Sequence, residues 1–369
     1  MKVKRISFFD NFKCSAQNCP DTCCKGWIIP LDDKALELYH SQSGLLLLRL
    51  ILTEQTQNDT VCFNKNSKTC PHLLKDGLCY LQKEYGEHFL CETCREYPRL
   101  LFNYRSFCKE CLDISCPEAA KLFINNLGSI KYDILETDIS YDVTITNDDE
   151  VFLTSLSHLE DKFLSHIDDD SLSLDIIFKD LSDYARLIQQ EYISNPSTDI
   201  LNKEYSFASN EALTFDALTT DRIIHTSFYH IKLRKTDPEL YRLCKLYKRK
   251  FNKLLISDID TILAVMDEEI KKVYPKIDIL LRSYCKYFIM CTFMAIYEDY
   301  SFLKHTCLAF VHTHMLKLFI YLHIDEKHTL NETQLIQIIN AYDRRAKHNN
   351  QIIAEMYDEI YKVIDPSSF

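Results

Sequence analysis

The chain has 369 residues, with 43 Lys and Arg against 54 Asp and Glu, for a formal net charge of -11 at pH 7. A chain of this length buries a large core without cross-links, and its charge argues against general nucleic-acid binding because no excess of cations neutralises phosphates. Its five glycines all lie at or before position 128, which excludes a glycine-rich dinucleotide or nucleoside loop from the rest of the chain.

Cysteine dominates the first third of the chain. Twelve of the 16 cysteines fall within residues 1–116, and the stretch "CSAQNCPDTCCKGW" sets Cys23 and Cys24 side by side. The opening "MKVKRISFFD" lacks an apolar run of signal-peptide length, so we expect a cytoplasmic protein, where disulfides rarely persist. Clustered cysteines in that setting indicate metal or redox chemistry.

The spacing of these cysteines predicts metal-binding loops. Thiolates bind zinc tetrahedrally or hold iron-sulfur clusters, and both need several sulfurs that converge from turns of the chain. Adjacent residues rarely ligate one ion comfortably, so we expect Cys23 and Cys24 to serve different metals or different irons of a cluster. Further candidates follow in "CPHLLKDGLCYL" and "CETCREYPR", at Cys70, Cys79, Cys91 and Cys94.

Cys116 stands directly before Pro117, a favourable first helical residue. The free N–H groups and the dipole at a helix N-terminus stabilise a thiolate, so this position suits a metal ligand. Arg99 follows the "CETC" pair, and we give it two roles: binding a carboxylate of a ligand, or pairing with a structural acid.

Two apolar stretches, residues 45–52 and 287–297, are shorter than the roughly 20 residues of a membrane-spanning helix. We predict that both are buried helix segments and that the chain has no membrane span. The alternating stretch "YDVTIT" at 141–146 predicts a strand before an acidic turn, "NDDE".

The last part of the chain has helical signals. Asp237 and Pro238 predict a helix start, and Thr329 with Glu332 predicts a capping box before "LIQIINAY". We assign four further cysteines in apolar contexts to the core: Cys244, Cys285, Cys291 and Cys307.

These signals predict a mainly α protein in two domains. Residues 1–125 are expected to form a cysteine-rich domain of loops and short helices that binds a metal or an iron-sulfur cluster. Residues 126–369 are expected to form a larger, mainly helical domain, to which substrate binding is assigned by division of labour.

Three segments resemble the flagellin lysine-N-methylase family: "FKCSAQNCPDTCCKGWIIPLD", "CPHLLKDGLCYLQKEYGEHFLCETCREYPR" and "LDISCPEAA". They resemble more loosely a cysteine-cluster family that chelates zinc or iron. The first resemblance implies methylation of flagellin lysines with S-adenosylmethionine by a protein of the bacterial flagellum system, and an iron-sulfur cluster. It covers about residues 8–122, with a fainter echo in "YDRRAKHNNQII".

The same resemblance implies the site residues. Arg99, Arg344 and His348 are implied contacts of the cosubstrate, although Arg344 and His348 at i and i+4 equally suit a solvated helix end. Beside the metal ligands the family pattern includes Trp27, Pro98, Arg99, Pro117 and Glu118. The implied metal ligands are Cys14, Cys19, Cys23, Cys24, Cys70, Cys79, Cys94 and Cys116.

Four other cysteines near these ligands, Cys62, Cys91, Cys108 and Cys111, look additional. Eight sulfurs can serve two four-sulfur sites, or one cluster and one zinc. The resemblance favours a 4Fe-4S cluster over zinc alone.

Methyl transfer to lysine needs a neutral amine held in line with the sulfonium methyl, and the sequence names no catalytic base. A polar displacement needs no metal, so a cluster would be structural, redox-active or an anchor for the cosubstrate. The usual C-x3-C-x2-C signature of radical enzymes is absent because Cys24 breaks its second gap.

Two other classes of function stay open. One is a non-catalytic zinc- or iron-binding protein that recognises a protein partner. The other is a redox protein in which Cys91 and Cys111 cycle through a disulfide.

Overall fold

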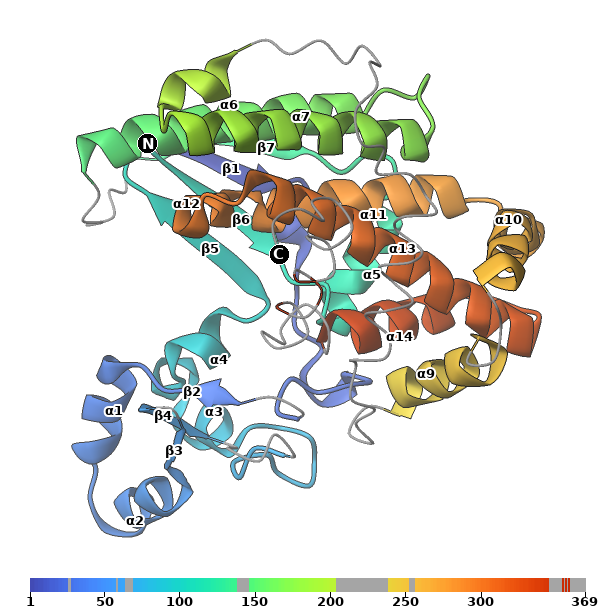
Figure 1. Cartoon of the computed structure of the whole chain (residues 1–369). Helices are drawn as coiled ribbons and strands as arrows, with labels where there is room; N and C mark the ends of the chain where they lie inside the picture. Colours follow the sequence, from blue (N-terminus) through green and yellow to red (C-terminus); the bar gives the residue numbers. More distant parts are fainter. Residues whose placement is uncertain are drawn as a thin grey trace.

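The computed structural model describes the chain except residues 26–27, 58, 64–68, 138–145, 204–237, 252–255 and 345–369, of which it describes only 354, 356 and 358. The described part is mostly helical, with a mixed α/β region that holds the N-terminal cysteines (Figure 1). Trp27 and His348, and most of the strand expected at 141–146, lie outside the described residues.

A four-stranded sheet carries the N-terminus and has the order β5-β6-β1-β7. Strand β1 is parallel to β6 and antiparallel to β7, while β5 and β6 form an antiparallel pair. Five of the six β6 residues are buried, as befits a central strand. The strands are β1 (Lys2–Ile6), β5 (Arg99–Tyr104), β6 (Phe107–Leu112) and β7 (Tyr132–Glu136).

Residues 29–94, which we call the cysteine lobe, surround a second, three-stranded sheet of order β2-β4-β3. Its strands are β2 (Ile29–Pro30), β3 (Gln55–Gln57) and β4 (Thr60–Phe63). Its helices are α1 (Asp33–His40), α2 (Gly44–Thr53), α3 (Tyr80–Tyr85) and α4 (Glu92–Glu96). Short 3-10 turns, η1 (Phe9–Asn11), η2 (Ala16–Asn18) and η3 (Glu87–Phe89), complete the N-terminal region.

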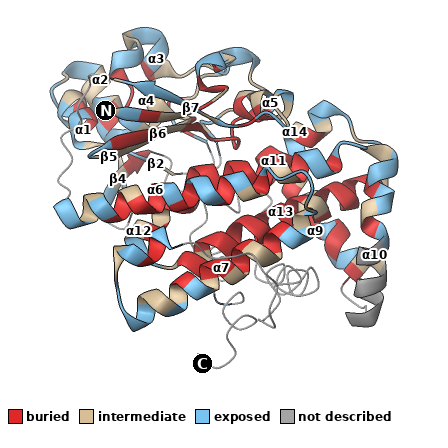
Figure 2. Cartoon of the chain, turned by 90° about the horizontal axis from the view of Figure 1, so that it is seen from above, coloured by how far each residue is buried: buried red, intermediate tan, exposed pale blue. Residues whose placement is uncertain are grey.

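The helical part packs around α13, which lies against α7, α9, α10, α11 and α14. Helix α13 is buried on nearly all sides, as Figure 2 shows, which is the pattern of a central core helix. The long helices are α5 (Pro117–Asn125), α6 (Asn147–Ile167), α7 (Leu174–Ser194), α9 (Pro238–Phe251), α10 (Ile256–Val273), α11 (Ile277–Thr292), α13 (Phe302–Lys327) and α14 (Glu332–Tyr342). Shorter pieces are η4 (Thr198–Asn202), η5 (Phe293–Ala295) and α12 (Ile296–Asp299).

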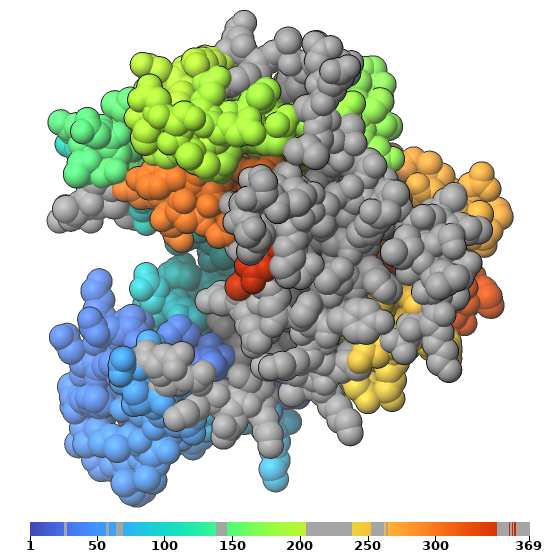
Figure 3. All heavy atoms as spheres, viewed as in Figure 1, coloured from blue at the N-terminus to red at the C-terminus, as the bar shows by residue number. Residues whose placement is uncertain are grey.

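The described side chains form two hydrophobic cores. The main core joins the helices to the N-terminal segment and to strand β6 with helix α5. The second core belongs to the cysteine lobe alone. In Figure 3 an indentation separates this lobe from helices α6 and α7 on the face shown.

Several sequence predictions are confirmed. The mainly helical class holds, α9 begins at Pro238, and the periodic apolar residues of α14 are buried. The stretch 287–297 is a buried helix segment with a short 3-10 turn. The four cysteines assigned to the core are also buried, namely Cys244, Cys285, Cys291 and Cys307.

Other predictions were wrong in detail. The N-terminal region contains two sheets besides loops and short helices. The sequence did not predict them because their strands are too short, or too buried on both faces, to show a clear alternation of apolar and polar residues. The acidic "NDDE" begins α6, capped by Thr146 and Asp149, and is no turn. The cap of α14 is the pair Asn331 and Gln334, two residues later than expected.

Helix α2 corrects another expectation, since "LLLLRLIL" is helical but largely exposed. Leu45 is 85% exposed and Leu52 is 72% exposed, and only Leu50 of this helix is buried. The cysteine lobe is therefore too small to cover the apolar face of its own helix.

Two long segments, Ile277–Asp299 and Phe302–Lys327, are apolar enough to cross a membrane by length and composition. Most of each lies buried against other helices of the main core, 94% for the most apolar window of the second. Core helices of this kind pass the same test, so the segments are weak evidence for a span.

Candidate functional site

The turn Asp113–Cys116, which follows strand β6, is held by helices distant in sequence. The Tyr287 hydroxyl on α11 donates to the Leu112 carbonyl at 3.0 Å and accepts from the Ile114 N–H at 3.2 Å. The Asn340 amide on α14 donates to the Ile114 carbonyl at 2.6 Å. These buried bonds fix the backbone that leads into Cys116.

The same turn is braced from its own side. The Ser115 N–H donates to Asp113 Oδ1 at 2.9 Å, and the Ser115 hydroxyl lies 3.0 Å from the Tyr97 hydroxyl. Tyr97 precedes Pro98 through a cis peptide bond. The Asp113 N–H donates to the Pro98 carbonyl at 2.7 Å, so the "YPR" and "LDISC" segments lie side by side.

Arg344, just beyond α14, joins the helical part to the first cysteine loop. Its Nη1 donates to Asp21 Oδ2 at 2.6 Å, and its Nη2 lies 3.4 Å from the Asp21 carbonyl and 3.3 Å from the Ser115 carbonyl. The Arg344 side chain is 8% exposed. The residue is therefore no solvated helix end, and it contacts the segments that carry Cys19, Cys23 and Cys116.

Arg99 occupies a different setting. Its guanidinium lies over the Phe12 ring, 5.3 Å from the ring centre, and it makes no ion pair with a carboxylate among the described residues. Of the three residues that the resemblance suggests for the cosubstrate, Arg99 makes no such pair within the described residues, Arg344 is bound by protein groups, and His348 lies outside the described residues.

Four thiols lie where the first cysteine loop meets α5. We call them the junction thiols: Cys14, Cys19, Cys23 and Cys116. Cys116 is the N-cap of α5, as predicted, with Pro117 in the first turn. Burial raises the pKa of Cys116 to about 12; the N–H groups of Ala119 and Glu118 oppose that rise, while the nearby Cys19 and Cys14 add to it. The helix N-terminus thus lowers the pKa of Cys116 as expected, but burial raises this pKa by more.

Cys23 and Cys24 touch each other yet face different neighbours. Contact with Cys23 is the main cause that lowers the pKa of Cys24 to about 7. The pKa of Cys23 is raised, first by contact with Cys24 and then by burial, with Cys116 and Cys14 adding to the rise. Cys23 therefore lies near the junction thiols Cys14 and Cys116, and it also lies near Cys94 of the lobe.

Cys24 lies toward the cysteine lobe. Its carbonyl accepts from the Cys70 N–H at 2.7 Å. Burial raises the pKa of Cys70 to about 12, and the thiols of Cys24, Cys79 and Cys91 add to the rise. The same neighbours, Cys24 and Cys91, help to raise the pKa of Cys79 after burial, its main cause.

Cys91 and Cys94 form a second contacting pair in the lobe. Contact with Cys94 lowers the pKa of Cys91, while contact with Cys91, followed by burial, raises that of Cys94. Cys111 instead contacts Cys291, which raises the pKa of Cys111 well above its usual value. Cys91 and Cys111 thus lie in different cores, each beside another thiol, and are not a disulfide pair in this structure.

The donor set fits a metal or a cluster in kind and number. Eight cysteines from separate segments face one another in neighbouring groups, and thiolates are the ligands of zinc and of iron-sulfur clusters. Across the part of the chain that the structure describes, no three Cys, His, Asp or Glu side chains lie close enough to hold one ion.

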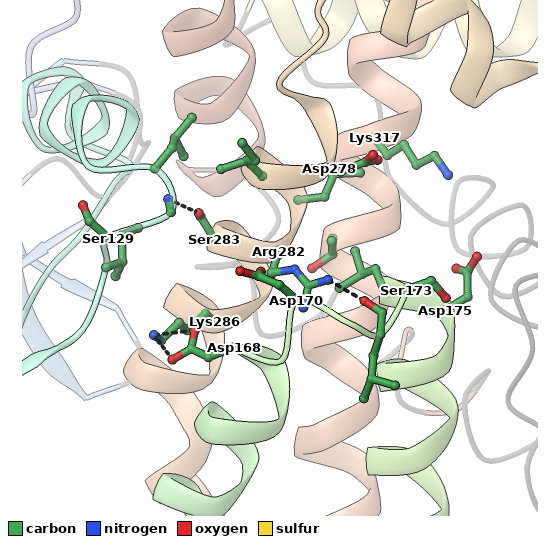
Figure 4. A pocket seen from close by; sticks show the side chains of 18 of the residues that line it. Ser129, Asp168, Asp170, Ser173, Asp175, Asp278, Arg282, Ser283, Lys286 and Lys317 are labelled. Atoms are coloured by element: carbon green, nitrogen blue, oxygen red, sulfur yellow. Dashed lines mark hydrogen bonds and ion pairs between the residues drawn. The ribbon is translucent and has the colours of Figure 1, made fainter. Parts of the chain in front are cut away.

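A cavity of about 1080 Å³ lies beside α11 and the turn between α6 and α7 (Figure 4). Arg282 closes this turn by donating to the carbonyls of Ile167, Asp169 and Leu172, at 2.6, 3.0 and 2.7 Å. Lys286 binds both oxygens of Asp168. The cavity is thus lined by charges of both signs.

His314 on α13 also lines this cavity. Its Nδ1 lies 3.0 Å from the Phe310 carbonyl, which can only accept, so Nδ1 carries the proton and Nε2 is an acceptor. Burial lowers the pKa of His314 to about 3, so the ring is neutral at pH 7. It is too weak a base to deprotonate a lysine, but it can accept a hydrogen bond from a ligand.

Sequence reasoning missed the cavity and the residues that clamp the Asp113–Cys116 turn. Tyr287 and Asn340 lie more than 170 residues from their partners, and no local pattern marks them. His312 and His314, two residues apart on α13, have different neighbours: His312 contacts Tyr342, whereas His314 lines the cavity.

Comparison with known proteins supplies independent information. A model of the FliB lysine N-methylase C-terminal domain matches residues 153–366, more than half of the chain. The flagellar biosynthetic protein FliU of Salmonella muenchen is 29% identical over 136 residues, which cover 34% of this chain and 78% of the relative.

Two lysine-N-methylases, from Salmonella choleraesuis (strain SC-B67) and Salmonella typhimurium (strain LT2), are also 29% identical over 136 residues. Each match covers 34% of this chain and 33% of the relative, so the chain spans about a third of the length of these enzymes. No solved structure matches.

Proposed function

The chain belongs to the FliB lysine N-methylase family, and from this membership we propose that it methylates lysine side chains of flagellin with S-adenosylmethionine and carries a cysteine-ligated iron-sulfur cluster. The observation that carries the proposal is the family match over residues 153–366. The relatives' names, lysine-N-methylase and flagellar biosynthetic protein, support lysine as the acceptor and flagellin as the substrate. The same proposal places the protein in the cytoplasm.

The matched region includes α11 and α14, whose side chains clamp the turn that leads into Cys116. The part of the chain recognised as a methylase is thus coupled by hydrogen bonds to the cysteine-rich part. This coupling supports one working unit rather than a methylase with an unrelated metal-binding appendage.

We place the cosubstrate in the cavity beside α11. S-adenosylmethionine carries an ammonium, a carboxylate and a sulfonium, so a lining with charges of both signs matches it. Pockets for such ligands have volumes of roughly 300–1,000 Å³, and this cavity of about 1080 Å³ lies just above that range, so it has room for the cosubstrate. His314 Nε2 would accept a hydrogen bond there, and Arg344 would hold the cysteine loop.

The cluster would be held by cysteines of the set implied by the resemblance, and it supplies redox chemistry or an anchor when bound. Described residues near these cysteines have structural roles. Tyr287 and Asn340 fix the turn before Cys116, and Arg344 fixes the loop between Cys19 and Cys23.

The test is methyl transfer by the anaerobically purified full chain to purified flagellin, with isotope-labelled S-adenosylmethionine and peptide mass spectrometry. We expect labelled methyl groups on flagellin lysines. Stoichiometric zinc without binding of S-adenosylmethionine, and no labelled lysine, would instead support the non-catalytic metal-binding protein.

The cavity has its own test. His314→Gln should weaken S-adenosylmethionine binding by about tenfold in calorimetry, the loss of one hydrogen bond to a ligand. The matched control is His158→Gln, at an exposed position on α6. Equal affinity of both variants and the parent would remove the cosubstrate from this cavity.

A further inference from the structure

The cations that line the cavity beside α11 are already engaged by protein groups. Arg282 donates to three backbone carbonyls of the turn between α6 and α7. The lysines each pair with one carboxylate: Lys131 with Asp133, Lys271 with Asp278, Lys286 with Asp168, and Lys317 with Asp267. The positive charges of the lining are thus held by the protein itself.

Two carboxylates of the same lining have no such partner. Asp170 lies on the turn between α6 and α7, and Asp175 lies in the first turn of α7 (Figure 4). Neither side chain makes a hydrogen bond or an ion pair within the described residues, and both residues are exposed. The charge that remains for a ligand is therefore negative, and it lies at the rim of the cavity.

The inner wall of the cavity gives an independent indication of a ligand. His314 is only 6% exposed, and its Nδ1 is bonded to the Phe310 carbonyl. Its Nε2 has no partner within the described residues. Buried polar atoms are nearly always hydrogen-bonded, so this acceptor indicates that a donor of a ligand reaches the inner wall. The cavity thus offers a neutral acceptor inside and free carboxylates outside.

This arrangement determines which kind of cation the rim suits. A carboxylate beside an amine favours the charged form of the amine, whereas methyl transfer needs the neutral form. Carboxylates that held the reacting amine would therefore slow the reaction. They suit a cation that keeps its charge, which in a protein substrate is another basic residue near the target lysine.

We propose that Asp170 and Asp175 bind a basic residue that flanks the target lysine, so that the protein selects lysines with an arginine or a second lysine nearby. This inference rests on the proposed function, because it names the class of substrate for the same cavity. The two carboxylates are exposed, so solvent and salt screen them, and together they should contribute about fivefold in affinity.

The test compares two synthetic peptides that each contain a single lysine, flanked on both sides by arginine in one and by glutamine in the other. Their binding to the full chain is measured by fluorescence anisotropy without cosubstrate. We expect the parent to bind the arginine peptide about fivefold more tightly at low salt. The double variant Asp170→Asn, Asp175→Asn should bind the two peptides equally. The matched control is Asp33→Asn, Asp148→Asn, at exposed positions in the first turns of α1 and α6, and it should keep the preference.

Equal affinity of the parent for the two peptides overturns the proposal. An equal loss of preference in the control overturns it too, because that loss would reflect net charge alone. Weaker binding of S-adenosylmethionine by the Asp170→Asn, Asp175→Asn variant also overturns it, since the carboxylates would then serve the cosubstrate.

A charge reversal covers the case in which that double variant does not fold. Asp175→Lys should prefer a peptide with glutamate in place of arginine, and a retained preference for arginine refutes the proposal. Methyl transfer plays no part in these readouts. A parent that binds the arginine peptide through Asp170 and Asp175 but methylates no lysine contradicts the proposed function alone.

Discussion

The two hydrophobic cores of this protein differ in size and in their content of cysteine. The main core is filled by large side chains such as Phe123, Phe163, Tyr284 and Tyr287, all nearly inaccessible to solvent. The lobe core is much smaller, with eleven buried residues among those described, and it includes and is bordered by thiols. Burial alone stabilises the first, whereas the second is expected to depend on what its thiols bind.

This difference also separates the roles of the two parts. The main core carries the family match, the cavity and the clamp on the Asp113–Cys116 turn. The lobe contributes the thiols of Cys70, Cys79, Cys91 and Cys94. The contrast is useful because each part should respond to a different perturbation.

Metal removal should produce the largest effect, and only in the lobe. A structural zinc contributes about 10–16 kcal/mol in small metal-folded units, so removal of a metal bound by the lobe thiols is expected to unfold residues 29–94. Hydrogen exchange after treatment with a chelator should show lost protection there, and retained protection in α11 and α13. Loss in both parts together, or in neither, would contradict the contrast.

Tyr287→Phe should weaken the main core without removing metal. The change leaves the Leu112 carbonyl and the Ile114 N–H buried without their hydroxyl partner. Each such group costs about 1–3 kcal/mol, so we expect the free energy of unfolding in urea to fall by about 2–4 kcal/mol.

The control for this substitution is Tyr192→Phe. Tyr192 is half-buried and stacks on Tyr300, but its hydroxyl makes no hydrogen bond within the described residues. It should change the free energy of unfolding by much less. Equal losses from the two variants would mean that the clamp on the turn adds nothing.

Sequence reasoning went furthest where the signals are local. The N-cap at Cys116, the start of α9 and the buried face of α14 follow from capping residues and helical spacing. These features need only a few neighbouring positions. The expectation that Cys23 and Cys24 serve different metals stays a prediction.

What stayed hidden depends on contacts between distant segments. The parallel pairing of β1 with β6 joins residues about a hundred positions apart, and no sequence pattern specifies it. The exposure of α2 could not be foreseen, because an apolar run does not say whether a partner surface exists. Arg344 was noticed through the resemblance, but its partner Asp21 was not.

The pH dependence of stability tests the main core separately from the lobe. The pKa of His314 is about 3 when folded, mainly through burial and then through Lys317, against about 6.5 when unfolded. As the pH falls below about 6.5 the unfolded chain binds a proton that the folded protein refuses, so stability present above that pH is lost. The loss from this residue should be about 2 kcal/mol between pH 7 and pH 5.

His314→Gln should remove that part of the pH dependence, measured as the free energy of unfolding in urea at the two pH values. The exposed His158→Gln serves as the control and should leave the pH dependence unchanged. A His314→Gln profile parallel to that of the parent would mean that His314 is protonated in the folded protein.

The smallest effect is expected where the two parts meet, at Arg344 and Asp21. The Asp21 side chain is 46% exposed, so solvent screens the pair and a double-mutant cycle with Arg344→Ala and Asp21→Ala should give a coupling of only about 1 kcal/mol. The exposed pair Lys83 and Asp76 lies at a similar distance, 2.7 Å, and should give no measurable coupling. Because Arg344 also contacts the Ser115 carbonyl, Arg344→Ala should speed hydrogen exchange in residues 14–24 more than Asp21→Ala does. Equal exchange in the two variants would mean that the ion pair alone, and not the bridge to the Asp113–Cys116 turn, holds the cysteine loop against the helical part.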